Sequence, residues 1–404
     1  MTISATTQGI KPGVCLSTSR PVNPFDGQVI YMTDVDQTAV WDGTQWTVLA
    51  PIAGGRNVII NGAMQVHQRG TSTASITTGG YYTADRFASS VSTMGTWTHS
   101  IENDAPTGSG FRKSVKVLCT TADASPASGD VLTFGQYIEG QNLQSFAKGT
   151  SSARQMTLSF WVKSNVTGTF IVDAYDADNT RQCSASYTIS AAATWEKKTI
   201  TLPADTTGAF DNDNALSMYL FFWLGAGSAF TGGSSLNTSW ASVVDNRRVV
   251  GQTNLAAATN NYWQITGVQL EAGAVATPFE FEDIGTTLDK CQRYYYRIKA
   301  TGNNYPLSMS GQCYAATGAI VFVHFPVTMR IPPTALEQSG TAADYKVWNA
   351  GTSGVNCNVV PTFNNSNNQQ SAVDIGVASG LVAGNATTLL STGAAAYLGW
   401  SAEL

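Results

Sequence analysis

The sequence predicts an all-β protein: a jelly-roll β-sandwich flanked by a small N-terminal β-hairpin module and a smaller C-terminal β-sandwich. Three observations lead to this fold class. Short runs of apolar or alternating residues recur along the 404-residue chain, dense turn-forming residues separate them, and sustained helical periodicity is missing. Because no internal repeat accompanies these strands, a sandwich is favoured over a long β-helix or a propeller.

The composition indicates ordered β-structure with an uncharged polar surface. Only 12% of the residues are charged, whereas 43% are hydrophobic, 10% are aromatic and 38 are glycine. Polar β-formers and glycine suit exposed sheet faces and tight turns, as in an extracellular β-protein or on a virion surface. A net charge of −5 and a pI of about 5.2 argue against a nucleic-acid partner, which would require a basic patch.

Three modules are expected, at residues 1–52, 53–284 and 285–404. The first contains a strand at 28–33 and a hairpin at 39–49, whose turn is Asp-Gly and whose two tryptophans can pair across the strands. A module of this size cannot bury a sizeable core alone. We therefore expect it to dock onto another protein.

The central module contains the clearest strands. They are expected at 156–163, 169–172, 195–202, 218–224 and 262–270. The first of these alternates regularly, with its apolar residues on one face and Trp161 on the other. These strands form the predicted jelly roll.

The C-terminal module begins with a short helix. Thr286 can cap this helix, and Leu288, Cys291 and Tyr295 share one face of it. Further on, the smaller sandwich is expected from strands at 319–325 and 395–401, an apolar run around Met329, and a polar surface loop at 364–370.

Several motifs of the central region become fairly specific when they are taken together. They are the runs 57–70, 82–87, 160–164, 195–197, 264–273, 276–280 and 291–295. With them, the chain resembles a widespread module of bacteriophage fibre and virion structural proteins. The strands Phe-Trp-Val-Lys and Val-Gln-Leu-Glu also resemble those of jelly-roll carbohydrate-binding modules. The resemblance implies a structural subunit of a virion appendage, either a tail fibre or a head fibre.

The resemblance also implies a location in the virion. The N-terminus lacks the charged-then-apolar pattern of a signal peptide, and no run is long enough to span a bilayer. We therefore expect synthesis in a host cytoplasm, release by lysis and no membrane insertion.

No C-x-x-C pair occurs, so a zinc site of the usual spacing is not expected. The cysteines should be free, buried thiols: Cys15, Cys119, Cys183, Cys291, Cys313 and Cys357.

No catalytic motif accompanies the titratable residues, so we expect no enzyme. The three histidines lie outside any recognisable catalytic context: His67, His99 and His324. Four acidic residues cluster near the end of the central module: Glu271, Glu280, Glu282 and Asp283. A glycosidase needs two carboxylates facing each other across a cleft, whereas a lone cluster at a strand end is more often a turn, cap or ion-pair site. A glycan-degrading fibre and a purely decorative capsid protein remain the alternatives.

Two oxygen-rich loops are candidate calcium sites, and calcium is the one cofactor left open. The first contains Asp173, Asp176, Asp178 and Asn179, and the second is 211–214. Ca²⁺ takes 6–8 oxygen ligands. The first loop, however, lacks the glycine and closing glutamate of an EF-hand, and Asp and Asn also form ordinary turns.

Tryptophans are the candidate saccharide-binding residues, because the faces of sugar rings stack on exposed aromatic rings. Trp240 lies among Ser, Thr and Asn, and Trp161 lies opposite the apolar face of its strand, so these two are the candidates. Trp223 stands in an apolar run and is expected to be buried or at a subunit interface.

The balance of side chains also predicts an oligomer. Abundant apolar strand residues beside few charges indicate buried subunit faces, and fibres commonly close as cyclic oligomers. We expect a non-covalent homotrimer that docks onto other virion proteins through residues 1–52. Three copies would raise the effective affinity for a weakly bound host-surface saccharide.

Overall fold

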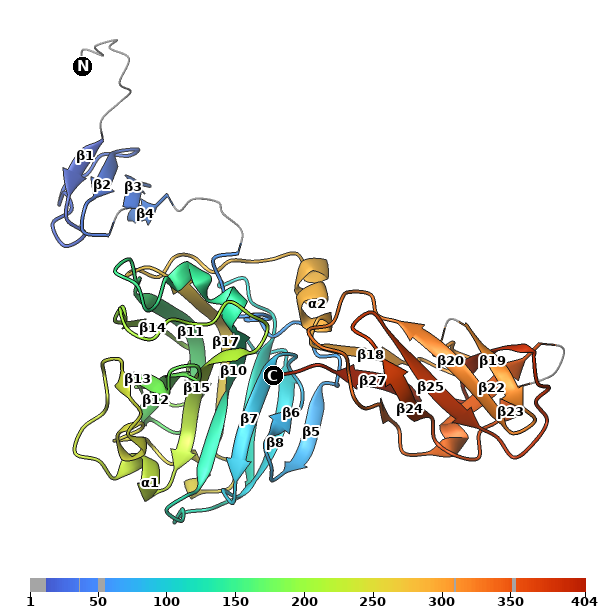
Figure 1. Ribbon diagram of the computed structural model, residues 1–404. Coiled ribbons are helices and arrows are strands. Elements are labelled where there is room, and N and C mark those ends of the chain that lie inside the picture. Colours follow the sequence, from blue (N-terminus) through green and yellow to red (C-terminus); the bar gives the residue numbers. More distant parts are fainter. Residues whose placement is uncertain (1–11, 36, 50–54, 309, 351–353) are drawn as a thin grey trace, which may run out of the picture.

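The computed structural model describes residues 12–35, 37–49, 55–308, 310–350 and 354–404 (Figure 1). Nearly all of its regular structure is antiparallel β-sheet, which confirms the all-β fold class. Short helices complete the chain: α1 (Ser228–Thr231), α2 (Ile284–Gln292) and five single 3₁₀ turns at 140–142, 144–146, 245–247, 255–257 and 342–344. Within the described ranges, no helix is long and apolar enough to cross a bilayer.

The N-terminal part forms one small sheet. Its strands, in spatial order, are β1 (Gly13–Cys15), β2 (Val29–Met32), β3 (Gln37–Trp41) and β4 (Trp46–Val48). Trp41 and Trp46 pair across the hairpin, with ring centroids 5.7 Å apart. Among the described residues of this part, the buried core consists of Ile30, Met32 and Ala39. The boundary expected after residue 52 lies outside the described residues.

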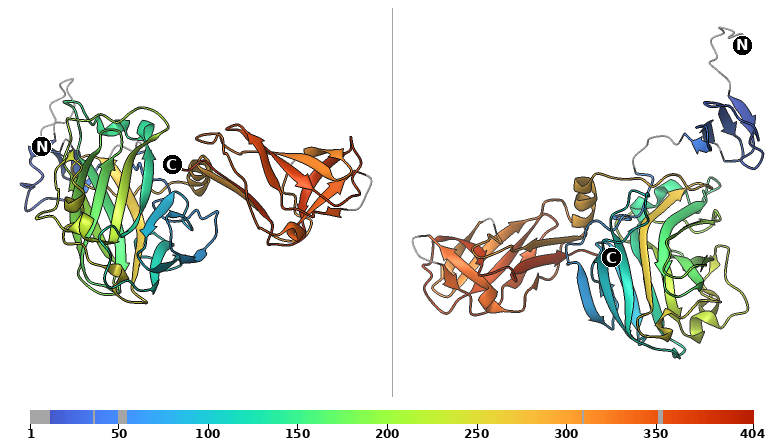
Figure 2. Two further views of the ribbon diagram at one scale, coloured as in Figure 1. Left: turned by 60° about the horizontal axis from the view of Figure 1, so that its bottom comes forward. Right: turned by 180° about the vertical axis from the view of Figure 1, so that it is seen from behind.

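Two stacked sheets form the central β-sandwich (Figures 1 and 2). The seven-stranded sheet has the order β16 (Ala241–Ser242), β13 (Arg181–Ile189), β12 (Gly168–Asp176), β15 (Leu216–Ala226), β10 (Val131–Glu139), β7 (Phe87–Ser92) and β6 (Gly80–Tyr81). The six-stranded sheet has the order β14 (Glu196–Leu202), β11 (Met156–Ser164), β17 (Tyr262–Ala272), β9 (Ser114–Thr121), β8 (Thr96–Glu102) and β5 (Ser72–Ile76). Strands far apart in sequence, such as β10 and β15, pair side by side, as a jelly roll requires.

Alternate residues of both sheets fill the sandwich core. Phe222 of β15 packs edge to face on Phe160 of β11, with ring centroids 5.0 Å apart, and Phe134 of β10 lies 5.8 Å from Trp263 of β17. All four side chains are buried. Because successive strand residues point to opposite faces, the neighbours of these core residues lie on the outer faces of the two sheets.

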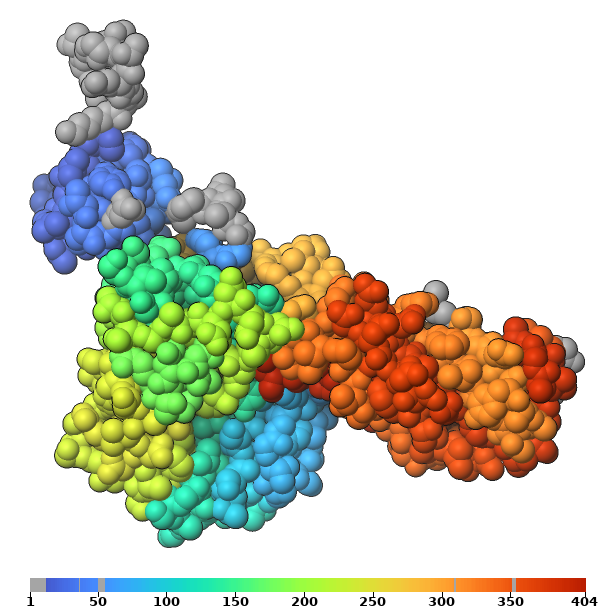
Figure 3. Space-filling model, viewed as in Figure 1, coloured from blue at the N-terminus to red at the C-terminus, as the bar shows by residue number. Residues whose placement is uncertain are grey.

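The C-terminal module is a second, smaller sandwich. A three-stranded sheet has the order β18 (Tyr295–Lys299), β27 (Tyr397–Ser401) and β21 (Glu337–Gln338). It faces a sheet of β23 (Val355–Asn356), β22 (Tyr345–Asn349), β26 (Ala386–Ser391), β19 (Ser310–Ala315), β20 (Gly318–His324), β25 (Gln370–Gly376) and β24 (Thr362–Ser366). In Figure 3 this module, coloured orange to red, extends to one side of the central sandwich.

Three local expectations in this module are wrong. Helix α2 is capped by the Asp283 side chain, which accepts from the backbone N–H of Gly285 at 2.8 Å, and not by Thr286. The polar run 364–370 is not simply a loop, since it contains the end of edge strand β24 and its turn into β25. Tyr295, expected on one helix face with Cys291, instead begins strand β18, because α2 ends at Gln292. Pairing with a neighbouring strand and burial override the local preference in each sheet region.

A cluster that we term the arginine joint connects the central and C-terminal modules. It consists of Arg69, Arg86, Tyr294, Tyr295 and Glu403. The Arg86 side chain is 1% exposed, forms an ion pair with Glu403 and lies with its guanidinium carbon 3.4 Å from the centroid of the Tyr294 ring. Arg69 pairs with the same carboxylate at 3.3 Å and stacks on Tyr295 at 3.5 Å. The joint thereby holds the segment after β27 against the seven-stranded sheet, as Figure 1 shows.

Candidate functional site

Four aromatic side chains lie on the outer face of the seven-stranded sheet, and we term them the aromatic face. They are Tyr137 of β10, Tyr175 of β12, and Tyr219 and Phe221 of β15. Each alternates with a core residue of its strand and is only partly buried. In Figure 1 the strands that carry them lie toward the viewer. The rings are therefore held on rigid, neighbouring strands, where the backbone fixes their spacing.

The strand register aligns the three tyrosines in a row. Tyr137 is paired with Tyr219 across β10 and β15, and Tyr219 is paired with Tyr175 across β15 and β12. Their ring centroids lie 4.9 Å and 5.5 Å apart, in edge-to-face arrangements. Burial raises the pKa of the Tyr219 phenol. This hydroxyl stays protonated at neutral pH and can both donate and accept a hydrogen bond.

An ion pair borders the aromatic face on the β12 side. The Arg248 Nε donates to Asp173 Oδ2 at 2.9 Å, and its guanidinium carbon lies 5.1 Å from the Tyr175 ring centroid. Asp173 is fully buried and also accepts from the Ser184 hydroxyl at 3.1 Å. Since Asp173 compensates the charge of Arg248, this border carries little net charge while Arg248 retains unused N–H donors.

Buried polar atoms without a partner lie on the same face. Gln182 of β13 is paired with Tyr175 in the strand register and extends the tyrosine row by one strand. It is fully buried, and neither its Oε1 nor its Nε2 has a hydrogen-bond partner among the described residues. The same holds for Thr133 Oγ1 and Trp223 Nε1, whose residues pair with each other across β10 and β15. Buried polar groups are rarely left unbonded, so these atoms are positions for buried water molecules and not for a ligand on the surface.

The position of Trp240 corrects one of the sequence-based expectations. Its ring is not an exposed platform: the residue is 8% exposed, and its Nε1 donates to the carbonyl of Pro203 at 2.9 Å. The ring also covers the buried ammonium of Lys148, whose Nζ lies 4.9 Å from the ring centroid. Trp240 therefore has a structural role in the central core. Trp223 is buried, as its apolar context indicated.

Trp161 lies where strand alternation placed it. It is half-buried on the outer face of the six-stranded sheet, opposite Lys197 of β14 and Thr266 of β17. This sheet is the other layer of the sandwich, so Trp161 and the aromatic face belong to separate surfaces.

The candidate calcium ligands do not converge. Strand β12 continues through Asp176, so Asp173 and Asp176 lie within it and not in a loop. Asp173 binds Arg248, Asp176 binds Lys148, and Asp178 accepts from the backbone N–H of Asp211 at 3.0 Å. No group of three or more His, Cys, Asp or Glu side chains in the described ranges is arranged to hold a metal ion.

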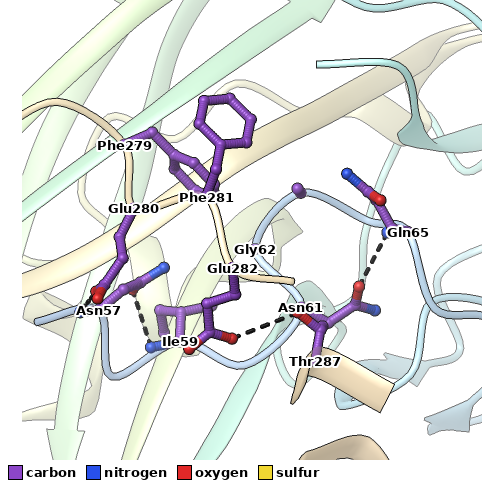
Figure 4. A pocket seen from close by; sticks show the side chains of 11 residues that line it. Asn57, Ile59, Asn61, Gly62, Gln65, Phe279, Glu280, Phe281, Glu282 and Thr287 are labelled. Carbon is purple, nitrogen blue, oxygen red and sulfur yellow. Dashed lines mark hydrogen bonds between the residues drawn. The ribbon is translucent and has the colours of Figure 1, made fainter. Parts of the chain in front are cut away.

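The acidic residues near the end of the central module form hydrogen bonds and ion pairs within the fold. Glu280 accepts from the backbone N–H groups of Gly55 and Asn57 at 2.7 and 2.8 Å, beside a pocket of about 30 Å³ (Figure 4). Glu282 forms an ion pair with Lys290, Asp283 caps α2, and Glu271 accepts from Thr277. The pocket has room for about one water molecule and not for a saccharide unit.

Sequence reasoning missed the tyrosine row. Tyr219 and Phe221 stood within an expected strand, whereas Tyr137 and Tyr175 lay outside every expected strand. Only the pairing of β10, β15 and β12 brings these rings together. The signal that could have revealed the row is alternation: each ring stands next to an apolar core residue in its strand and therefore points to the outer face.

The comparisons with known proteins identify no family for this chain. No family model and no curated protein matches it. Similar solved structures include the enzymatically active domain of tailspike protein 4 of bacteriophage CBA120, at 16% identity and a TM-score of 0.29, with 54% of this chain and 21% of that chain covered. A family 11 carbohydrate-binding module of a Clostridium thermocellum cellulase matches at 11% identity and a TM-score of 0.26, with 54% and 95% covered. The chain thus spans about a fifth of the tailspike structure. At these scores the likenesses establish neither a family nor a shared activity.

Proposed function

We propose that the chain is a non-enzymatic structural subunit of a bacteriophage virion appendage whose central module binds a host-surface saccharide at the aromatic face. The motifs at 57–70, 160–164 and 264–273, which resemble those of phage fibre proteins, support the virion role. The saccharide role has independent support in the side chains on the seven-stranded sheet.

The tyrosine row is the observation that carries the proposal. Tyr137, Tyr219 and Tyr175 occupy three adjacent strands, so their rings form a line about 10 Å long at the usual strand spacing. An aromatic ring offers an apolar surface to the C–H face of a sugar, and the phenol hydroxyl binds a sugar hydroxyl. A row of such rings fits an extended saccharide better than a compact ligand.

The charge of the site favours a neutral saccharide. The aromatic face contains no Asp, Glu, Lys or Arg side chain of its own, and the neighbouring Arg248 is compensated by Asp173. Hydrogen bonds from Arg248 can orient sugar hydroxyls, and its ion pair with Asp173 means that no uncompensated charge is buried.

Assembly would convert weak binding into firm attachment. We propose a non-covalent homotrimer, docked onto other virion proteins through residues 1–52. Linked copies on one particle raise the overall avidity by about 10²–10⁴ when they bind together. Light scattering should give three times the chain mass, and a chain lacking residues 1–52 should remain a soluble oligomer but no longer enter virions. A stable monomer would contradict the trimer.

A glycan array probed with the multimerised protein tests the saccharide role. We expect binding to a neutral host-derived glycan, with loss of signal in Tyr219→Ala but not in Tyr314→Ala, whose ring is 57% exposed in the C-terminal module. An absence of signal would leave a spacer or decorative role. Release of reducing ends from the same glycans would contradict the non-enzymatic role and indicate that the protein is a depolymerase.

A further inference from the structure

The outer face of the six-stranded sheet carries a second cluster of aromatic and cationic side chains, far from the tyrosine row. We term it the basic face; it consists of Trp161, Lys163, Trp195, Lys197, Lys116, Tyr262 and Gln264. Figure 2, right, shows the sandwich from behind, on the side of this sheet.

Tryptophan and lysine alternate between β11 and the start of β14. Trp161 is paired with Lys197 in the strand register, and the Lys163 Nζ lies 5.2 Å from the centroid of the Trp195 ring. Both tryptophans are partly exposed. Two indole faces separated by ammonium groups form a surface that is both apolar and positively charged.

A carboxylate fixes one side of this arrangement. Asp104 accepts from Trp195 Nε1 at 3.1 Å and from Gln264 Nε2 at 3.2 Å, and it forms an ion pair with Lys163. Gln264 also donates to Ser114 Oγ at 2.9 Å. The Trp195 ring is therefore held in place before any ligand arrives.

Two lysines of the face retain uncompensated charge. Lys197 is exposed, and Lys116 lies 4.6 Å from the Tyr262 ring centroid; neither forms an ion pair within the described part of the chain. Lys116 is paired with Gln264 of β17, so its ammonium lies on the same face. Strand β8 places Glu102 on the same face, next to the register partner of Lys116. The three lysines, less the two carboxylates Asp104 and Glu102, leave a local charge of +1, whereas the whole chain has −5.

A hollow next to Asp104 extends the face. The loop 103–112 borders an open depression of about 370 Å³, lined by both chain neighbours of Asp104 and by Arg112. This volume is within the range of small-ligand sites, about 300–1,000 Å³. Arg112 is exposed and adds a planar donor group that matches a carboxylate.

We propose that the basic face binds an acidic saccharide, at a site separate from the aromatic face and with different selectivity. Sugar rings stack on Trp161 and Trp195, and the sugar carboxylates contact Lys197, Lys116 and Arg112. Charge complementarity selects this occupant over a neutral glycan, which can accept hydrogen bonds from the ammonium groups but gains no ionic attraction. It also favours a saccharide over a flat apolar protein surface, since burying the lysines against apolar groups would cost desolvation energy.

Affinity electrophoresis in gels that contain polygalacturonate tests the proposal, with dextran as the neutral probe. We expect retardation by polygalacturonate alone, weakened by added salt because exposed charges are screened. Lys197→Gln should weaken binding about tenfold, the usual loss for one charged hydrogen bond. Trp161→Ala should weaken it comparably. The matched controls Lys299→Gln and Trp348→Ala change an exposed lysine and tryptophan of the C-terminal module and should have no effect.

The same experiment separates this site from the saccharide site on the aromatic face. Tyr219→Ala should leave the retardation by polygalacturonate unchanged. Equal retardation of Lys197→Gln and Lys299→Gln, or none for the intact protein, would overturn the proposal. A concentration-dependent oligomer that Trp161→Ala dissociates would also overturn it and identify a second copy of the chain as the occupant.

Discussion

Removing Arg86 from the arginine joint should destabilise the protein strongly, and removing its partner as well should restore most of the loss. The side chains of Arg86 and Glu403 are 1% and 5% exposed. Breaking a buried ion pair from one side costs about 3–5 kcal/mol, because it leaves an uncompensated buried charge. Arg86→Met also removes the hydrogen bond to the carbonyl of Tyr137 at 2.7 Å and the contact with Tyr294.

The second partner of Glu403 determines how large a loss of stability we expect for Arg86→Met. Arg69 still lies 3.3 Å from the carboxylate after Arg86→Met, so a loss near the lower end, about 3 kcal/mol, is expected. The double variant Arg86→Met/Glu403→Met removes both charges of the buried pair, a replacement that is often neutral by itself. It also takes the carboxylate from Arg69, whose side chain is 11% exposed, so we expect a loss of about 1 kcal/mol.

Urea unfolding followed by tryptophan fluorescence measures these differences in the free energy of unfolding. A matched control is Arg112→Met, which removes an exposed arginine and should change the stability by less than about 0.5 kcal/mol. The reasoning would be refuted by an Arg86→Met loss below about 1 kcal/mol, or by a double variant that is less stable than either single variant.

Three further predictions concern buried groups. Trp240→Ala should lower stability by about 3–5 kcal/mol through the cavity that it leaves while saccharide binding per folded molecule stays unchanged; a stable variant that no longer binds would contradict the structural role. Burial raises the pKa of Asp85 to about 6, above the unfolded value of about 3.9, so its stabilising contribution is complete below pH 4 and is lost as the pH rises through 6. The stability of Asp85→Asn relative to wild type, from urea unfolding, should therefore increase between pH 4 and pH 7, and a pH-independent difference would refute this. The native protein should react quickly with a thiol reagent only at the partly exposed Cys15, with the five buried thiols reacting after unfolding; a disulfide-linked ladder on a non-reducing gel would contradict free thiols.

Strand alternation made the layers of the fold predictable. In β11, the apolar positions of Met156, Leu158 and Phe160 share the core face, and Trp161 lies outside, as the pattern indicated. The Asp-Gly hairpin of the N-terminal sheet was equally local, since its turn and its two tryptophans are close in sequence. Such features depend on neighbouring residues and can be inferred from one sequence.

Features set by contacts between distant segments were not predictable. Trp240 has polar neighbours in sequence, but the carbonyl of Pro203 and the ammonium of Lys148 bury it. Asp173 and Asp176 suggested one loop, whereas the length of β12 places them on opposite faces of a strand. The tyrosine row required the register of strands separated by long connections, and a shift of one residue would turn those rings into the core.

The central claim is that the aromatic face binds a neutral host-derived polysaccharide. Affinity electrophoresis of a variant that lacks two rings of the tyrosine row tests this claim most directly. Tyr175→Ala/Tyr219→Ala removes two of the three rings, whereas Tyr314→Ala removes an exposed ring elsewhere. With folding checked by circular dichroism, we predict that wild type and Tyr314→Ala are retarded equally and that the double variant migrates as in a gel without polysaccharide. Equal retardation of all three proteins would contradict the claim.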